Sequence, residues 1–179
     1  CQSYKDEYLL KHVDTKAAHI YILDGRTKNY EKECSNFELA IRQKGGIDLF
    51  VGGGGADGHI AFNEPFSSLD SHTRVKTLTT ETMKIKAKLF GGDISKVPHT
   101  VLTVGTGTIM DAREVMLLAT GAAKAEATRA AIEGSVNHRW AVSALQMHRH
   151  GIYVCDEDAA SKLEQETVSY LKDIERNAY

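Results

Sequence analysis

The chain has 179 residues, of which 42% are apolar, and a formal net charge of −2, so one domain with a sizeable core is expected. Acidic and basic residues are interspersed, and no stretch approaches the roughly eighteen apolar residues of a membrane span. Composition therefore gives no reason to expect a nucleic-acid partner or a membrane partner.

The three cysteines, Cys1, Cys34 and Cys155, are odd in number and far apart. Such a set fits reduced thiols in a cytoplasmic protein better than a disulfide framework. No pair of cysteines or histidines has the spacing of zinc ligands, so no metal site is expected.

Segments with helical and strand-like patterns alternate along the chain. Tyr30, Cys34, Phe37 and Ile41 recur at steps of three and four residues, which predicts a helix that ends near the glycines at 45–46. In chain order, the expected helices cover residues 4–12, 29–44, 80–90, 122–133 and 159–178. The expected strands cover residues 19–23, 47–51, 74–78, 100–104, 115–119, 141–144 and 152–155.

This alternation predicts the fold class. Strands separated by helices indicate an α/β protein with three layers, in which a mostly parallel, Rossmann-like sheet has helices on both faces. No internal repeat, low-complexity segment or linker interrupts the pattern, so we expect a single domain.

The most informative segment follows the expected strand at 47–51 and reads GGGGADGHIAFNEP over residues 52–65. Glycine lets a backbone approach a ligand closely, and the loop after a strand's carboxyl end is where open α/β sheets bind ligands. Asp57, His59 and Glu64 fall within eight residues of this loop. A carboxylate can fix the tautomer of a histidine, and a second can share in proton transfer. A glycine-rich turn with solvated side chains would have the same spacing.

The whole string resembles the signature of the glucosamine-6-phosphate deaminases, the isomerase-deaminases that convert glucosamine 6-phosphate to fructose 6-phosphate and ammonia. The resemblance extends over essentially the entire chain. It continues through Ser67-Ser68-Leu69 and residues 73–78, 102–108, 110–116, 136–138, Trp140 and 154–157.

The resemblance implies roles for individual residues. Asp57 and Glu64 would support His59 in a carboxylate–imidazole–carboxylate relay that opens the sugar ring, without a metal or organic cofactor. Gly53, Lys88 and Lys124 would bind the sugar-phosphate substrate. Lys88 stands where the family usually has arginine, and lysine keeps the charge but lacks the bidentate fork.

Lys124 is informative even without the resemblance. It falls in the first turn of the expected helix at 122–133, where the helix dipole disfavours a cation. A lysine there is easier to explain if an anion occupies the helix end, although a solvated surface lysine is the alternative.

A further set of positions implies regulation. In allosteric members of the family, which are hexamers, the matching residues hold the phosphate of N-acetylglucosamine 6-phosphate between subunits. The resemblance to these members implies a homohexamer with this activator, whereas other members are monomers and lack this regulation. Arg74 and Lys76 taken alone are alternate residues of an expected strand, and a solvated face would look the same. His72 departs from the arginine usual in the family. The set is Ser67, Arg74, Lys76, Thr77 and Tyr170.

Compared with the family pattern, the chain lacks an amino-terminal portion with the first strands, a threonine/glycine phosphate loop and the aspartate that serves as enolising base. We therefore expect residues 1–179 to form the carboxyl-terminal two-thirds of a single isomerase-deaminase domain. A stretch without the enolising base is expected to be inactive or nearly so by itself.

The expected function is thus isomerisation and deamination of glucosamine 6-phosphate in amino-sugar catabolism in the cytoplasm. Sugar-phosphate lactonases are one alternative, since they share a glycine-rich Asp-Gly-His loop but not its continuation at 60–65. A phosphosugar-binding module without catalysis is another, because the enolising aspartate is absent. No helix-turn-helix is present to support a transcription regulator.

Overall fold

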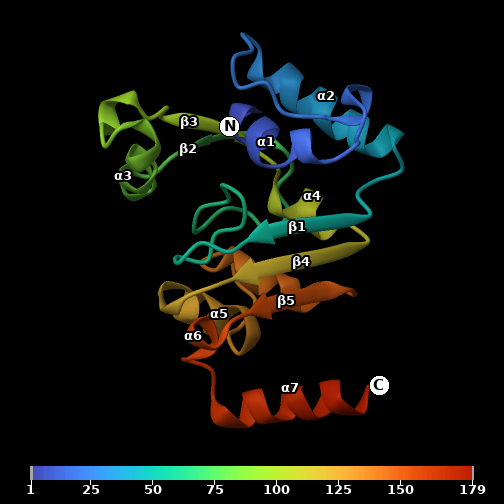
Figure 1. Cartoon of the computed structure of the whole chain (residues 1–179), viewed down its shortest axis with the longest axis vertical. Helices are drawn as coiled ribbons and strands as arrows, with labels where there is room; N and C mark the ends of the chain where they lie inside the picture. The colour runs from blue at the N-terminus through green and yellow to red at the C-terminus, as the bar shows by residue number, and fades with distance from the viewer. Residues whose placement is uncertain (1, 179) are drawn as a thin grey trace.

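The computed structural model describes residues 2–178, so Cys1 lies outside the described residues (Figure 1). Its central element is a parallel sheet with the strand order β1-β4-β5. These strands are Leu49–Gly53, Glu114–Ala119 and Gly151–Cys155. Because the strands are parallel, the loops that follow β1, β4 and β5 leave from the same edge of the sheet. The expected α/β fold with a mostly parallel sheet is confirmed.

The core lies between this sheet and the helices that pack on it. Val115 and Leu117 of β4 are fully buried, as are Ile109 of helix α4 and Val142 of the 3₁₀ helix η6. Ile60 of the glycine-rich loop belongs to the same core and is 0% exposed. The elements are α4 (Thr106–Met110), α5 (Ala125–Ile132) and η6 (Ala141–Met147).

A second, antiparallel pair of strands stands apart from the parallel sheet (Figure 1). In it, β2 (Arg74–Thr77) pairs with β3 (Thr100–Thr103). The segment between them forms α3 and two 3₁₀ helices, and the side chain of Thr79 caps α3 by accepting a hydrogen bond from the Thr82 amide. The helices are α3 (Thr80–Ala87), η3 (Lys88–Phe90) and η4 (Ile94–Lys96).

The remaining helices lie towards the ends of the chain or beside the sheet. Helix α7 is set apart from the sheet at the carboxyl end, with exposed apolar side chains at Leu171 and Ile174 (Figure 1). No described helix has the length and apolar character needed to cross a membrane. These helices are α1 (Gln2–Tyr8), η1 (Leu10–His12), η2 (Ala17–His19), α2 (Tyr30–Gln43), η5 (Ala122–Lys124), α6 (Glu157–Ala160) and α7 (Gln165–Asn177).

Two expected strands are wrong. Residues 20–23 have no regular structure and follow the turn η2, because no strand among the described residues pairs with them. The segment 141–144 lies in the 3₁₀ helix η6, since a short buried apolar run has no periodicity that separates a strand from a helix. The Ser143 hydroxyl donates to the carbonyl of Trp140 within this turn.

A half-buried carboxylate joins α2 to α4 and to Thr73, the residue before β2. Oε1 of Glu38 accepts hydrogen bonds from the Thr73 amide, at 2.9 Å, and from the Thr108 hydroxyl, at 2.7 Å. Burial alone raises the pKa of Glu38, but the hydrogen bonds from Thr73 and Thr108 outweigh it, and the net pKa lies below the usual 4.5. The ionised carboxylate is therefore part of what holds α2 in place.

Replacing Glu38 with Gln should lower the free energy of unfolding by about 1–2 kcal/mol at neutral pH, because hydrogen bonds to a charged acceptor are lost. Because the pKa of Glu38 is lower in the folded protein than its usual 4.5, the stabilisation by Glu38 is complete above pH 4.5. It is lost as the pH falls through the folded-state pKa. Urea unfolding of E38Q and wild type along a descending pH series should show the difference shrinking. E175Q, an exposed change on α7, serves as the control. A difference that stays constant with pH would contradict this role.

Candidate active site

The glycine-rich loop turns back on itself directly after β1. The amide of Gly55 donates to the carbonyl of His59 at 2.8 Å, and the amide of Gly58 donates to the carbonyl of Gly55 at 3.0 Å. Gly58 has a φ of +79°, and a Cβ there would lie 2.3 Å from Cε3 of Trp140. Glycine is therefore required at this position by both backbone conformation and space.

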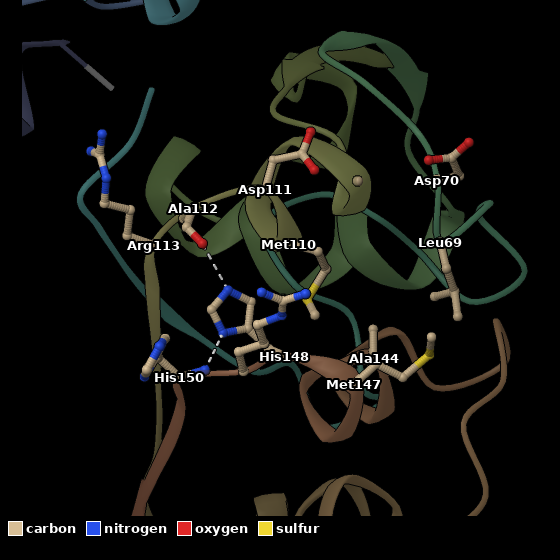
Figure 2. A pocket seen from close by; sticks show the side chains of 12 residues that line it. Leu69, Asp70, Met110, Asp111, Ala112, Arg113, Ala144, Met147, His148 and His150 are labelled. Carbon is tan, nitrogen blue, oxygen red and sulfur yellow. Dashed lines mark hydrogen bonds between the residues drawn. The ribbon is translucent and has the colours of Figure 1, made fainter. Parts of the chain in front are cut away.

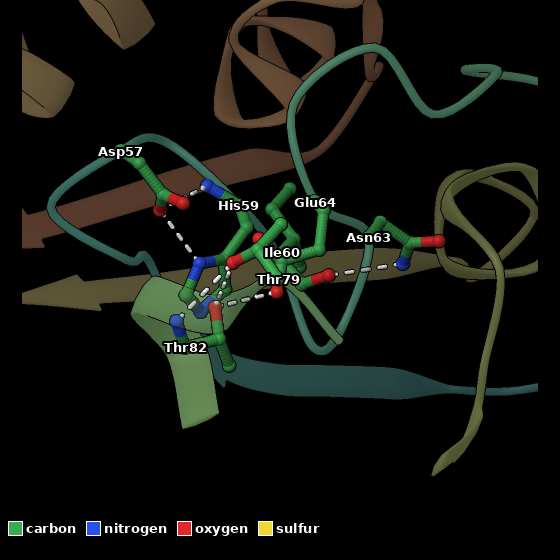
Figure 3. A network of polar contacts seen from close by, with 7 residues as sticks. All are labelled: Asp57, His59, Ile60, Asn63, Glu64, Thr79 and Thr82. Atoms are coloured by element: carbon green, nitrogen blue, oxygen red, sulfur yellow. Dashed lines mark hydrogen bonds and ion pairs between the residues drawn. The ribbon is translucent and has the colours of Figure 1, made fainter. Parts of the chain in front are cut away.

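Asp57 and His59 form a close pair in this turn (Figure 3). Oδ1 of Asp57 lies 2.6 Å from Nδ1 of His59 and also accepts the His59 amide at 3.3 Å. The hydrogen bond from His59 lowers the pKa of Asp57, which outweighs the opposing effect of burial. Because an ionised carboxylate only accepts, Nδ1 of the neutral imidazole must carry the hydrogen, which leaves Nε2 free to take a proton.

Glu64 lies at the far end of the loop and is buried, with 5% of its surface exposed. The backbone on either side of it is left-handed at Ala61 and Phe66, with φ of 54° and 69°. Oε1 of Glu64 accepts a hydrogen bond of 2.6 Å from the Thr82 hydroxyl of α3 (Figure 3). The carboxylate of Glu64 is thus held by helix α3, which lies outside the loop that carries Glu64.

The structure brings the three residues of the expected relay together. One potential ligand atom from each of Asp57, His59 and Glu64 lies within 4.8 Å of the others. Two ligands of a tetrahedral zinc ion lie roughly 3.3 Å apart, which is longer than the 2.6 Å between Asp57 and His59. The spacing of that pair suits proton sharing better than metal binding. The catalytic role of the three residues remains a prediction.

The residues expected to bind substrate come from two elements at the carboxyl edge and one outside it. Gly53 ends β1, and Lys124 ends η5 in the connection that follows β4, next to β1 in the sheet. Lys88 is exposed and begins η3, directly after α3. Their contacts with a substrate remain predictions.

The positions expected to be regulatory divide into two groups. Arg74 and Lys76 lie half-buried on one side of β2 and Thr77 on the other, as alternation predicts. Burial lowers the pKa of Arg74, which pairs with no carboxylate among the described residues. The Ser67 hydroxyl is buried without a hydrogen-bond partner there. Tyr170 lies on α7, far from β2 in the same chain (Figure 1).

Several residues that shape the site were not found by sequence reasoning. Asn63 is fully buried and donates from its side-chain amide to the carbonyls of Ile60 and Val104, both at 2.9 Å. Trp140 lies against Gly58, a contact that the sequence does not indicate. Thr82 was not singled out at all. The Thr79–Thr82 spacing predicts a helix cap, but no pattern in the sequence joins Thr82 to Glu64.

A cavity of about 780 Å³ lies elsewhere (Figure 2). Its lining includes Arg113, which precedes β4, and His148 and His150, which precede β5, so it belongs to the opposite edge of the sheet from the glycine-rich loop. Nε2 of His148 donates to the carbonyl of Ala112 at 2.8 Å, and its Nδ1 accepts the His150 amide at 3.0 Å. Both ring nitrogens of His148 are thus occupied in holding the fold.

Comparisons with known proteins match most of the chain to one family. The family model of glucosamine-6-phosphate isomerases/6-phosphogluconolactonase matches residues 2–154. A glucosamine-6-phosphate deaminase from Caenorhabditis elegans is 54% identical over 170 residues, which cover 95% of this chain and 64% of the relative. The chain spans slightly less than two thirds of the length of the curated relatives it matches.

Two solved structures extend the comparison. A monomeric glucosamine-6-phosphate deaminase superposes with a TM-score of 0.85 at 35% identity, covering 89% of this chain and 66% of that one. The 6-phosphogluconolactonase from Trypanosoma brucei superposes with a TM-score of 0.60 at 20% identity, covering 88% of this chain and 65% of that one. At that identity, the second likeness shows the fold alone.

Proposed function

The chain belongs to the glucosamine-6-phosphate isomerase/6-phosphogluconolactonase family, and we propose that it acts in amino-sugar catabolism by converting glucosamine 6-phosphate to fructose 6-phosphate and ammonia. The observation that carries this proposal is the Asp57–His59 pair, with Nε2 of the imidazole left free, at the carboxyl edge of the parallel sheet. Similar proteins with this activity in their names support it.

In this proposal, His59 opens the sugar ring. Nε2 takes the proton of the anomeric hydroxyl and returns a proton to the ring oxygen, so the imidazole is alternately neutral and charged. The ionised Asp57 stabilises the charged imidazole and keeps Nδ1 protonated in both states. The nearby carboxylate of Glu64 supplies a second negative charge beside the imidazolium.

The phosphate of the substrate requires positive charge and amide donors. We assign this role to Lys124 and Lys88, and we assign Gly53 to close backbone contact with the substrate. Lys124 is the N-cap residue of α5, where the partial positive charge of the helix end favours an anion. Neither side chain has an ion-pair partner among the described residues.

Isomerisation also needs a base for the C2 proton, and the resemblance puts that aspartate in the part of the relatives that this chain does not match. We therefore propose the complete reaction for the full-length protein, with residues 1–179 as part of a single isomerase-deaminase domain. No metal or organic cofactor takes part in this scheme.

The lactonase alternative has weaker support. Relatives that are 52–56% identical are named as deaminases, whereas the 6-phosphogluconolactonase structures are only 19–21% identical to this chain. A phosphosugar-binding module would not require the close Asp57–His59 pair, so we favour the enzyme.

The full-length protein should release ammonia from glucosamine 6-phosphate in a coupled assay, and H59Q should lower kcat/KM by about 10²–10⁴-fold, the contribution typical of a general acid–base group. The pH–rate profile should also change, because the imidazole no longer takes part in proton transfer. H150Q, an exposed histidine at the opposite edge of the sheet, is the matched control. Lactone hydrolysis without ammonia release would overturn the proposal, and an unchanged pH profile in H59Q would remove His59 from the mechanism.

We also propose that Ser67, Arg74, Lys76, Thr77 and Tyr170 form a site for N-acetylglucosamine 6-phosphate between subunits of a cytoplasmic homohexamer. The Ser67 hydroxyl is buried without a hydrogen-bond partner, and half-buried Arg74 donates to the carbonyl of His72 but pairs with no carboxylate among the described residues, which suits an anion site. Since Tyr170 is remote from β2 in its own chain, a neighbouring subunit would have to supply it. The free thiols of Cys34 and Cys155 are compatible with the cytoplasm.

If this site exists, the effector should lower the substrate concentration at half-maximal rate in the wild-type hexamer, with a coupling of about 1–3 kcal/mol. K76E should lose this response, because a carboxylate would repel the phosphate, whereas K32E, an exposed lysine of α2, should keep it. Initial rates with and without effector, together with sedimentation velocity, provide the measurement. A monomer, or hyperbolic kinetics that ignore the effector, would contradict this regulation.

A further inference from the structure

Thr82 contacts the candidate active site from outside the loop that carries it. Its hydroxyl donates to Oε1 of Glu64 at 2.6 Å, and the two residues are 7% and 5% exposed. Eighteen residues separate them in the chain, and the contact joins α3 to the loop after β1. Water has little access to this bond, so its loss would leave the carboxylate oxygen without a donor.

The direction of this hydrogen bond is determined by a third residue. Oγ1 of Thr79 accepts the Thr82 amide at 3.2 Å as the cap of α3, and the Thr79 hydroxyl donates to Oγ1 of Thr82 at 3.1 Å (Figure 3). A hydroxyl has one hydrogen to give. Since Oγ1 of Thr82 receives the hydrogen of Thr79, its own hydrogen is directed to Glu64, and bonds in such a chain strengthen one another.

Glu64 has few other contacts that could orient its side chain. No lysine or arginine pairs with it among the described residues. Its own backbone is held independently, because its carbonyl accepts the Ser67 amide at 3.0 Å and the neighbouring Asn63 is fully buried. The backbone therefore brings the carboxylate to the site, and the hydrogen bond from Thr82 to Oε1 fixes how the carboxylate is turned there.

We propose that Thr82 is the positioning residue for Glu64, and that the placement of α3 thereby controls the orientation of this carboxylate beside His59. The inference rests on the ring-opening role proposed above for Glu64. It extends that role by making a helix outside the parallel sheet part of the catalytic arrangement.

Two further features of α3 connect the placement of this helix to the loop and to the proposed phosphate contact. The ammonium of Lys86 lies 5.3 Å from the ring centroid of Phe62, which is a second contact between α3 and the loop. Lys88, assigned above to the substrate phosphate, begins η3 directly after the last residue of α3. A phosphate that draws Lys88 inward would therefore act on the same helix that holds Glu64.

The test replaces Thr82 with Val, which has nearly the same shape but no hydroxyl, in the full-length protein. We expect kcat for ammonia release to fall by about 10- to 100-fold, the loss typical of one hydrogen bond to a charged group, with KM changed by no more than about twofold. T82S keeps the hydroxyl and should recover most of the rate. The pH–rate profile of T82V should shift along the pH axis, and that of T82S should not.

T128V is the matched control, because Thr128 is also a buried threonine whose hydroxyl contacts another hydroxyl, that of Tyr153, but it is in α5. It should lower thermal stability at least as much as T82V while leaving kcat and the pH profile unchanged. Equal kinetic losses in T82V and T128V, or a T82S variant as slow as T82V, would show that Thr82 acts only through stability and would overturn the inference.

A readout without turnover separates this inference from the proposed function. If the wild-type protein releases no ammonia, the proposed function fails, but the ¹⁵N chemical shifts of the His59 imidazole can still be followed with pH. A moved Glu64 carboxylate should displace this titration curve in T82V and not in T82S or T128V. Curves that coincide in all four proteins would contradict the positioning role whatever the substrate.

Discussion

The burial of Ile60 is the constraint on which the candidate site depends. This side chain is 0% exposed in the core beside β4, so the loop after β1 must turn inward at its midpoint. Asp57 and His59 precede the buried residue in the loop and Glu64 follows it. All three lie at the carboxyl edge of the sheet. The hydrophobic core thus fixes the backbone from which three titratable side chains converge.

Contacts with separate elements complete this arrangement. The Trp140 ring packs against Gly58, where a larger residue would clash, and the Thr82 hydroxyl of α3 donates a hydrogen bond to Glu64. The proposed site therefore combines a rigid part, built on the parallel sheet, with a part carried by the segment between β2 and β3. If that segment moves when a substrate or effector binds, the carboxylate of Glu64 would respond while the Asp57–His59 pair stayed in place.

Much of this could be predicted from the sequence, because it depends on local patterns. The alternation of strand-like and helical segments predicted the fold class, and the glycines after the apolar run at 47–51, with the short spacing of Asp57, His59 and Glu64, predicted the loop. The antiparallel pairing of β2 with β3 and the Thr82–Glu64 bond could not be predicted, since they join distant segments. The periodicity of a short buried apolar run such as 141–144 does not distinguish a strand from a helix. The strand expected at 19–23 was wrong because a strand also needs a second strand to pair with, and none of the described strands pairs there.

In the proposed mechanism, Asp57 holds His59 in the tautomer that leaves Nε2 free to accept a proton. Two-dimensional ¹⁵N–¹H spectra of the imidazole side chains, recorded on the full-length protein at a pH where His59 is neutral, test it most directly. We expect a protonated, pyrrole-like Nδ1 and an unprotonated, pyridine-like Nε2 for His59. The opposite assignment, with the proton on Nε2, would contradict it.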